Sequence, residues 1–198
     1  TGQRRVGKSY LLYQIIDEIK SLENDLNIVF INMELHDFTG IKNSDDLISY
    51  INSHLVKRNK NYVFIDEIQD IENFEKALRH YQASNTAEIF CTGSNAGLLS
   101  GELATLLSGR YIEFHISGLS YKEFLRFQET DDNNESFNRY IRFGSLPYLR
   151  NLPNDEVVIY EYIKSVYNTI LYKDIVSRFN IRNTALLENL LRFLMDNI

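Results

Sequence analysis

The chain has 198 residues, 44% of them hydrophobic and 24% charged, so it can bury the core of a substantial domain, and general disorder is not expected. The formal net charge of -6 gives no global attraction to nucleic acid or to an anionic membrane, although 21 lysines and arginines leave a local basic face open. The single cysteine excludes an internal disulfide framework, and no apolar run reaches the roughly 18 residues of a membrane span, so a soluble cytoplasmic protein is predicted.

The chain opens on a glycine-rich segment, Gly2 to Ser9, that matches G-x-x-x-x-G-K-[ST] in full. Such a loop aims backbone amides at phosphate when it follows a strand and opens a helix. A helix is predicted next, because apolar residues recur at helical spacing from Tyr10 to Lys20. Only Thr1 stands where the preceding strand belongs, so we expect the sequence to lack its first strand. The alternative is a chance match in an unrelated loop.

The residues expected to bind the nucleotide phosphates in and beside this loop are Gly2, Gln3, Arg4, Arg5, Val6, Gly7, Lys8, Ser9 and Tyr10. Lys8 is expected to reach the β- and γ-phosphates and to act in catalysis. The Ser9 hydroxyl is expected to ligate Mg²⁺. The side chains of Arg4 and Arg5 are not needed for this chemistry.

Strands and helices alternate after the first helix. Buried strands are predicted from β-branched and aromatic runs at 27–33, 62–65, 87–92 and 111–116. Helices are predicted between them at 44–55, 73–83 and 98–107, the first with Ser44 as its N-cap. This alternation is typical of an α/β fold in which a parallel sheet is covered by helices on both faces. The α/β core is assigned to residues 1–118.

Two carboxylates, Asp66 and Glu67, follow the apolar run at 62–65. The carboxyl ends of parallel strands form the edge at which open α/β sheets bind ligands. Asp66 is expected to hold Mg²⁺, and Glu67 to orient and deprotonate the attacking water. The alternative is that both residues only cap the next helix. Because the loop and the acid pair occur together in the right order, the sequence predicts hydrolysis of Mg-ATP.

Two further residues are candidates for the catalytic site. The third predicted strand ends on Thr92-Gly93-Ser94-Asn95, and Ser94 is expected to face the γ-phosphate or the water, with an ordinary turn as the alternative. Arg110 precedes the fourth predicted strand and is a candidate to neutralise transition-state charge in a neighbouring subunit, with a solvated arginine as the alternative. The chain contains no Asn-Lys-x-Asp sequence, the guanine-reading motif, so ATP is favoured over GTP.

Beyond residue 118 the strand pattern stops. Helices are predicted at 120–129, 137–143, 156–178 and 184–198, with a polar turn at 131–135. Aromatic and basic residues in this last third, among them Tyr160, Tyr172 and Arg182, indicate nucleic-acid contacts less strongly than they indicate core and solvated helix faces.

Five segments together resemble the AAA-type ATPases of prokaryotes, and more narrowly the archaeal-ATPase-like group, which carries a winged-helix and a nuclease-like domain of uncertain role downstream. The segments are 1–12, 64–70, 92–95, 108–110 and 117–125. The resemblance implies a P-loop NTPase fold of the AAA/ASCE type with Walker A and Walker B motifs and the sheet order 5-1-4-3-2. It also implies a helical lid at 119–182 and the start of a winged helix at 183–198.

The segment Gly144-Ser145-Leu146-Pro147 resembles the lid motif of related signalling ATPases, in which the proline packs near adenine. Pro147 is therefore a candidate cofactor-binding residue, with a plain turn between helices as the alternative.

Two functions stay open at this point. In the first, the protein hydrolyses Mg-ATP to drive movement between core and lid, gated by a protein partner or by a homo-oligomer. In the second, it is a slow-turnover regulatory switch that acts on a partner or on nucleic acid through C-terminal domains. A P-loop kinase would need a substrate pocket and an arginine-bearing lid, and neither is identifiable.

Overall fold

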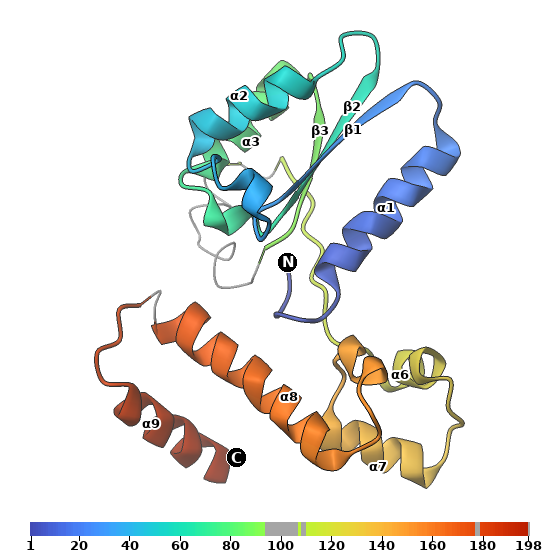
Figure 1. The fold of residues 1–198 in the computed structure, drawn as a ribbon, viewed down its shortest axis with the longest axis vertical. Coiled ribbons are helices and arrows are strands. Elements are labelled where there is room, and N and C mark those ends of the chain that lie inside the picture. The colour runs from blue at the N-terminus through green and yellow to red at the C-terminus, as the bar shows by residue number, and fades with distance from the viewer. Residues whose placement is uncertain (94–106, 108–109, 177–178, 198) are drawn as a thin grey trace. The chain divides into compact units, whose positions relative to one another are not determined.

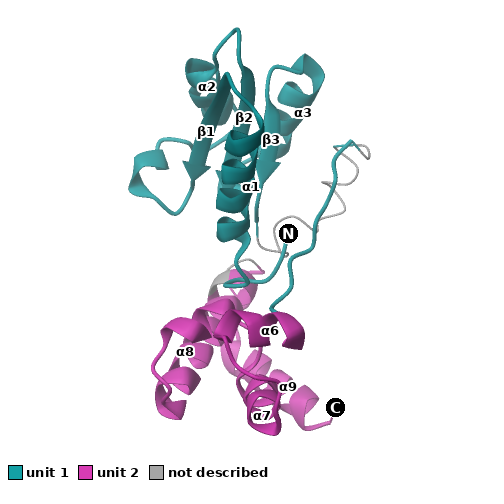
Figure 2. Cartoon of the chain, turned by 90° about the vertical axis from the view of Figure 1, so that its right-hand side faces the viewer, with its two compact units in different colours: residues 1–119 teal, residues 120–198 magenta. Residues whose placement is uncertain are grey.

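The computed structural model describes residues 1–93, 107, 110–176 and 179–197 (Figure 1). The chain divides into two compact units, residues 1–119 and residues 120–198 (Figure 2). The parallel sheet belongs to the first unit, unit 1, and the described elements of the second, unit 2, are all helical.

Unit 1 is organised around a parallel sheet of three strands in the order β1-β2-β3. The strands are β1 (Leu26–Asn32), β2 (Lys60–Asp66) and β3 (Glu88–Cys91). Residues 63–65 of the central strand are fully buried, as expected for a strand covered on both faces. The register pairs Asn32 with Asp66 and Ile65 with Cys91, so all three strands end at one edge of the sheet.

Helices cover both faces of this sheet, with α1 on one side and α2 and α3 on the other (Figure 1). The helical elements are α1 (Lys8–Leu22), α2 (Ser44–His54), α3 (Phe74–Ser84) and the single 3-10 turns η1 (His36–Phe38) and η2 (Ile68–Asp70). Leu12 and Ile16 of α1 share a buried cluster with Phe64. Leu47 of α2 and Tyr81 of α3 belong to the cluster on the opposite face. The prediction of an α/β unit with a parallel sheet is therefore confirmed.

The start of α2 differs from the prediction in its capping residue. Asn43, rather than Ser44, is the N-cap, because its Oδ1 accepts hydrogen bonds from the backbone amides of Asp45 and Asp46 at 2.9 and 3.1 Å. Ser44 is instead buried at the first helical position. One asparagine side chain thus satisfies two of the amides that the first turn of a helix leaves unpaired.

Residues 111–116 do not form the predicted fourth strand. Ile116 forms an isolated parallel bridge with Gly2, and its amide donates to the Thr1 carbonyl oxygen at 2.8 Å. The Thr1 amine donates to the Phe114 carbonyl oxygen at 2.7 Å, so the backbone pairing of this segment with Thr1 and Gly2 is too short for a strand. Residues of this segment and of β3 also line a groove of about 980 Å³.

Unit 2 contains only helices among its described residues. They are α6 (Tyr121–Gln128), α7 (Asn134–Phe143), η3 (Pro147–Asn151), α8 (Glu156–Thr169), the π-helix η4 (Ile170–Val176) and α9 (Thr184–Asp196). Phe143, Leu149 and Ile159 form a buried core. Asn133 caps α7 by accepting from the Ser136 amide at 2.9 Å, so the helix begins within the stretch predicted as a turn.

The long helix predicted at 156–178 is α-helical only as far as Thr169 and continues as η4, and residues 177–178 lie outside the described part of the chain. In a π-helix the backbone hydrogen bonds join residues five apart instead of four apart. The spacing of apolar residues in the sequence does not distinguish a π-helix from an α-helix. In the part of the chain that the structure describes, no helix has both the length and the apolar character needed to cross a bilayer.

Candidate functional site

The loop from Gly2 to Gly7 leads directly into the first turn of α1. Gly2 and Gly7 both have positive φ, at 156° and 101°, and so does Arg5 at 68°. A Cβ on Gly2 would lie 2.3 Å from the Ile116 carbonyl oxygen, so the close approach of two backbones requires glycine there. At Gly7 there is open space, and the backbone conformation alone requires glycine. No side chain caps α1, which leaves its first amides and its positive dipole end directed at this loop.

Lys8 is the first residue of α1 and is only 5% exposed. Its Nζ donates to the Gln3 carbonyl oxygen at 3.0 Å and lies 3.9 Å from Glu67 Oε1. A hydrogen-bonded ion pair has a separation of about 2.7–2.9 Å, so this pair is a long one. A buried ammonium needs compensating negative charge, and the Glu67 carboxylate supplies part of it. The phosphate loop and the acid pair therefore meet at the same edge of the sheet.

Asp66 ends β2 and is 1% exposed. The Thr92 hydroxyl donates to Asp66 Oδ1 and accepts the Glu67 amide at 3.3 Å. The Thr92 carbonyl oxygen accepts the Ile68 amide at 3.0 Å, so both ends of this threonine fix the turn that carries the acids. Thr92 belongs to the segment 92–95 that was predicted to face the γ-phosphate or the water, but Ser94 was the candidate chosen there, and the contacts of Thr92 with the acids were not predicted. The signal for it was the register, because pairing of Ile65 with Cys91 puts the next residue of each strand side by side.

Glu67 has the left-handed backbone conformation, with φ 58° and ψ 49°. This conformation is uncommon for a residue other than glycine and occurs in tight turns and at functional sites. Gln69, in the 3-10 turn that follows, donates from Nε2 to Glu67 Oε2 at 2.5 Å. Both oxygens of the Glu67 carboxylate therefore have a neighbour, Lys8 on one side and Gln69 on the other. Gln69 is a second residue that sequence reasoning missed.

The remaining predicted residues of the loop differ in exposure. Tyr10 is 76% exposed and packs edge-on against Tyr13 with ring centroids 6.3 Å apart, so its ring lies on the solvent side of α1. Arg5 is exposed, whereas Val6 is buried. Ser9 is half-buried at the second position of α1, next to Lys8 and in the first turn.

Ser94 lies outside the described residues, as does the helix predicted at 98–107 except for Leu107, which is helical and buried. Pro147 begins η3 in unit 2. Among the described residues there is no group of three or more His, Cys, Asp or Glu side chains that could hold a metal ion by itself.

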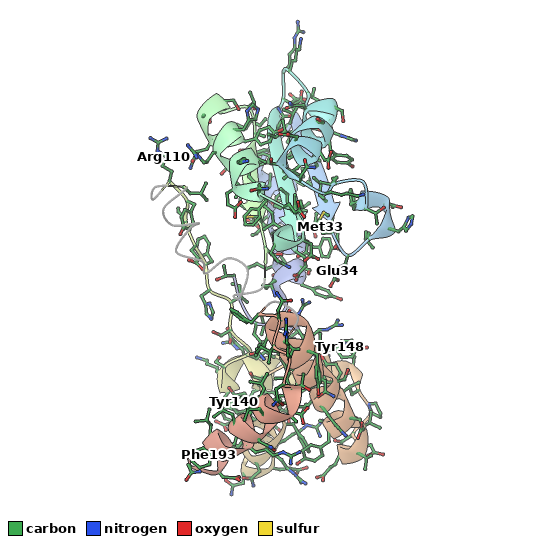
Figure 3. The ribbon with its side chains drawn as sticks, turned by 90° about the vertical axis from the view of Figure 1, so that its left-hand side faces the viewer. Met33, Glu34, Arg110, Tyr140, Tyr148 and Phe193 are labelled. Carbon is green, nitrogen blue, oxygen red and sulfur yellow. The ribbon has the colours of Figure 1, made fainter. Side chains whose placement is uncertain are left out.

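Arg110 is exposed and is not brought to the phosphate loop of its own chain. Its carbonyl oxygen accepts from Gln82 Nε2 on α3, and its amide donates to Leu107. In a nearly extended segment, the six steps from Arg110 to Ile116 span roughly 20 Å. Figure 3 shows Arg110 well apart from Met33 and Glu34, which follow β1 at the carboxyl edge.

Replacing Thr92 by valine is expected to destabilise unit 1 by about 1–3 kcal/mol, because a buried carboxylate and a buried amide lose their shared hydroxyl partner. Thr92→Ser, which keeps the hydroxyl, should lose much less. The measurement is the free energy of unfolding by urea titration, with Thr86→Val as the control at an exposed threonine. Equal stability of Thr92→Val and the wild type would show that the hydroxyl does not hold Asp66.

Comparison with known proteins agrees with this geometry. A family model described as "AAA domain" matches residues 1–125. An uncharacterized protein of Haemophilus influenzae is 35% identical over 205 residues, which cover 100% of this chain and 50% of that protein. An uncharacterized protein of Methanocaldococcus jannaschii is 36% identical over 193 residues, with 92% of this chain and 42% of that protein covered. The chain thus spans about half the length, or less, of these curated relatives.

Proposed function

The chain belongs to the AAA domain family, and on that premise we propose that it binds Mg-ATP at the carboxyl edge of its sheet and hydrolyses it. AAA domains are in general nucleotide-binding ATPases. The observation that carries the proposal is the convergence of one buried cation and two acids, with Lys8 Nζ 3.9 Å from Glu67 Oε1 and Asp66 next in sequence. A long, buried ion pair at the uncapped start of a helix is suited to a polyphosphate.

Each part of the site has a role in this proposal. The loop amides and the first turn of α1 donate to phosphate oxygens, and Lys8 supplies positive charge at the β- and γ-phosphates. Ser9 and Asp66 provide the hard oxygen ligands that Mg²⁺ prefers when it is held largely by phosphates. When bound, Mg²⁺ neutralises charge on those phosphates. Glu67 accepts a proton from the attacking water. We also propose that Ser94 lies near the γ-phosphate. Arg110 is proposed to act on the nucleotide of a neighbouring subunit.

We further propose the sheet order 5-1-4-3-2, in which β1, β2 and β3 correspond to strands 2, 3 and 4. The parallel bridge between Gly2 and Ile116, with the Thr1 amine donating to the Phe114 carbonyl oxygen at 2.7 Å, supports parallel pairing of residues 1–2 with residues 114–116. The proposal also includes a helical lid at 119–182, in which Pro147 contacts adenine, and a winged helix from residue 183. It further includes assembly in the cytoplasm as a homo-oligomer or with a protein partner.

The proposal predicts that Mg-ATP binds more tightly than Mg-GTP and that phosphate is released at steady state. Calorimetric titration with each nucleotide measures binding, and a coupled phosphate assay measures turnover. EDTA is expected to abolish turnover, because Asp66 and Ser9 act only through the metal ion. Binding of ATP with turnover no faster than the uncatalysed background would favour the regulatory switch. Failure to bind either nucleotide would overturn both functions.

A further inference from the structure

Gln69 holds the Glu67 carboxylate through a local turn of the backbone. Because Glu67 is in the left-handed conformation, the chain reverses at once, and the Asp70 amide donates back to the Glu67 carbonyl oxygen at 3.1 Å. The side chain two residues later therefore comes beside the acid, and Gln69 Nε2 lies 2.5 Å from Glu67 Oε2. A side chain can meet its neighbour at this spacing because the turn is not α-helical.

The orientation of the Gln69 amide follows from its neighbour. Beside a carboxylate, only the NH₂ group makes an attractive contact, since the amide oxygen would face another oxygen. The Gln69 carbonyl oxygen, Oε1, must then point the other way. That oxygen is buried and has no hydrogen-bond partner among the described residues. A buried acceptor that no described residue satisfies is a place where a bound water or ligand can donate a hydrogen bond.

We propose that Gln69 is a water-positioning residue for ATP hydrolysis, whose Oε1 accepts a hydrogen bond from the attacking water while its Nε2 fixes the Glu67 carboxylate. This inference rests on the proposed function. The water has two O–H groups, and one is directed to Glu67, the proton acceptor. An acceptor for the second O–H fixes the rotation of the water, so that a lone pair faces the γ-phosphorus.

The step is balanced without any further reactant. The water oxygen forms a bond to the γ-phosphorus as the bond from that phosphorus to the bridging oxygen of ADP breaks. One proton passes to Glu67, and the other hydrogen stays on the phosphate product. Gln69 is neutral throughout and neither gains nor loses a proton.

The test is Gln69→Met, which keeps the length of the side chain and removes both polar atoms. We expect kcat for ATP to fall about ten- to a hundredfold, the effect of one hydrogen bond made in the transition state, while the Kd for ATP changes less than about twofold. Gln69→Glu keeps an acceptor but sets a carboxylate against Glu67, so we expect it to lower kcat as well. Gln14→Met removes an exposed amide on α1, elsewhere in unit 1, and should leave kcat unchanged.

A double variant separates positioning from a structural role. If Gln69 acts on the water that Glu67 deprotonates, Gln69→Met added to Glu67→Gln should cause little further loss of kcat. Additive losses, or a drop in the melting temperature together with weaker ATP binding, would show that Gln69 only supports the fold. Unchanged kcat in Gln69→Met would overturn the inference. Absence of nucleotide binding by the wild type would instead refute the proposed function, so the two failures are distinguishable.

Discussion

Replacing Glu67 by glutamine is expected to lower kcat for ATP by about 10²–10⁴-fold, the usual contribution of a general base. The substitution keeps the size of the side chain but removes its ability to accept a proton. Binding of Mg-ATP should not weaken, because the carboxylate that now lies 3.9 Å from Lys8 Nζ competes with phosphate for that cation. The measurement is steady-state phosphate release together with the Kd for ATP by calorimetry.

The matched control is Glu72→Gln, which removes an exposed carboxylate just beyond the same turn. It should leave both kcat and Kd unchanged. Retention of wild-type turnover by Glu67→Gln would remove the general base from the mechanism. Loss of ATP binding in the same variant, with an intact melting transition, would mean that Glu67 holds the nucleotide rather than the water.

The sequence predicted the elements of unit 1 well because burial on both faces of a parallel sheet leaves a strong signal. The runs at 27–33 and 62–65 are apolar and β-branched, and both lie within a residue or two of the observed strands. Residues 111–116 have the same composition but do not form a strand. Composition reports the tendency of a segment to be extended, whereas a strand also needs a neighbour at hydrogen-bonding distance.

The candidate site was predicted in its main parts but not in its supporting contacts. Lys8 stands in the glycine-rich loop, and Asp66 and Glu67 form the acid pair at the end of a strand. The residue types and spacing of these two motifs indicate their chemistry. Thr92 could have been found by pairing β2 with β3 residue by residue. Gln69 could not, because its contact depends on the left-handed conformation of Glu67, which residue propensity does not predict. The N-cap of α2 was assigned to the wrong residue for a different reason. Asn43 and Ser44 are adjacent and are both good capping residues, so residue type alone does not choose between them.

Replacing Lys8 by methionine is expected to weaken Mg-ATP binding by roughly a hundredfold or more, because the phosphates lose charge-assisted hydrogen bonds. Methionine keeps an unbranched apolar stem where the lysine is 5% exposed, so packing around α1 should survive. The variant also removes the cation beside the buried Glu67 carboxylate, and leaving one partner of a buried ion pair uncompensated is destabilising. Its melting temperature should therefore fall, so its affinity for ATP is measured well below the unfolding transition.

Lys20→Met is the matched control, because it removes an exposed cation from the last turn of the same helix. If the affinity for ATP depended on overall charge, the two variants would weaken binding equally, since each lowers the net charge by one. If the affinity depends on the loop amides and Lys8 at the start of α1, only Lys8→Met will weaken binding. Wild-type affinity in that variant would contradict the assignment of the nucleotide to this edge of the sheet.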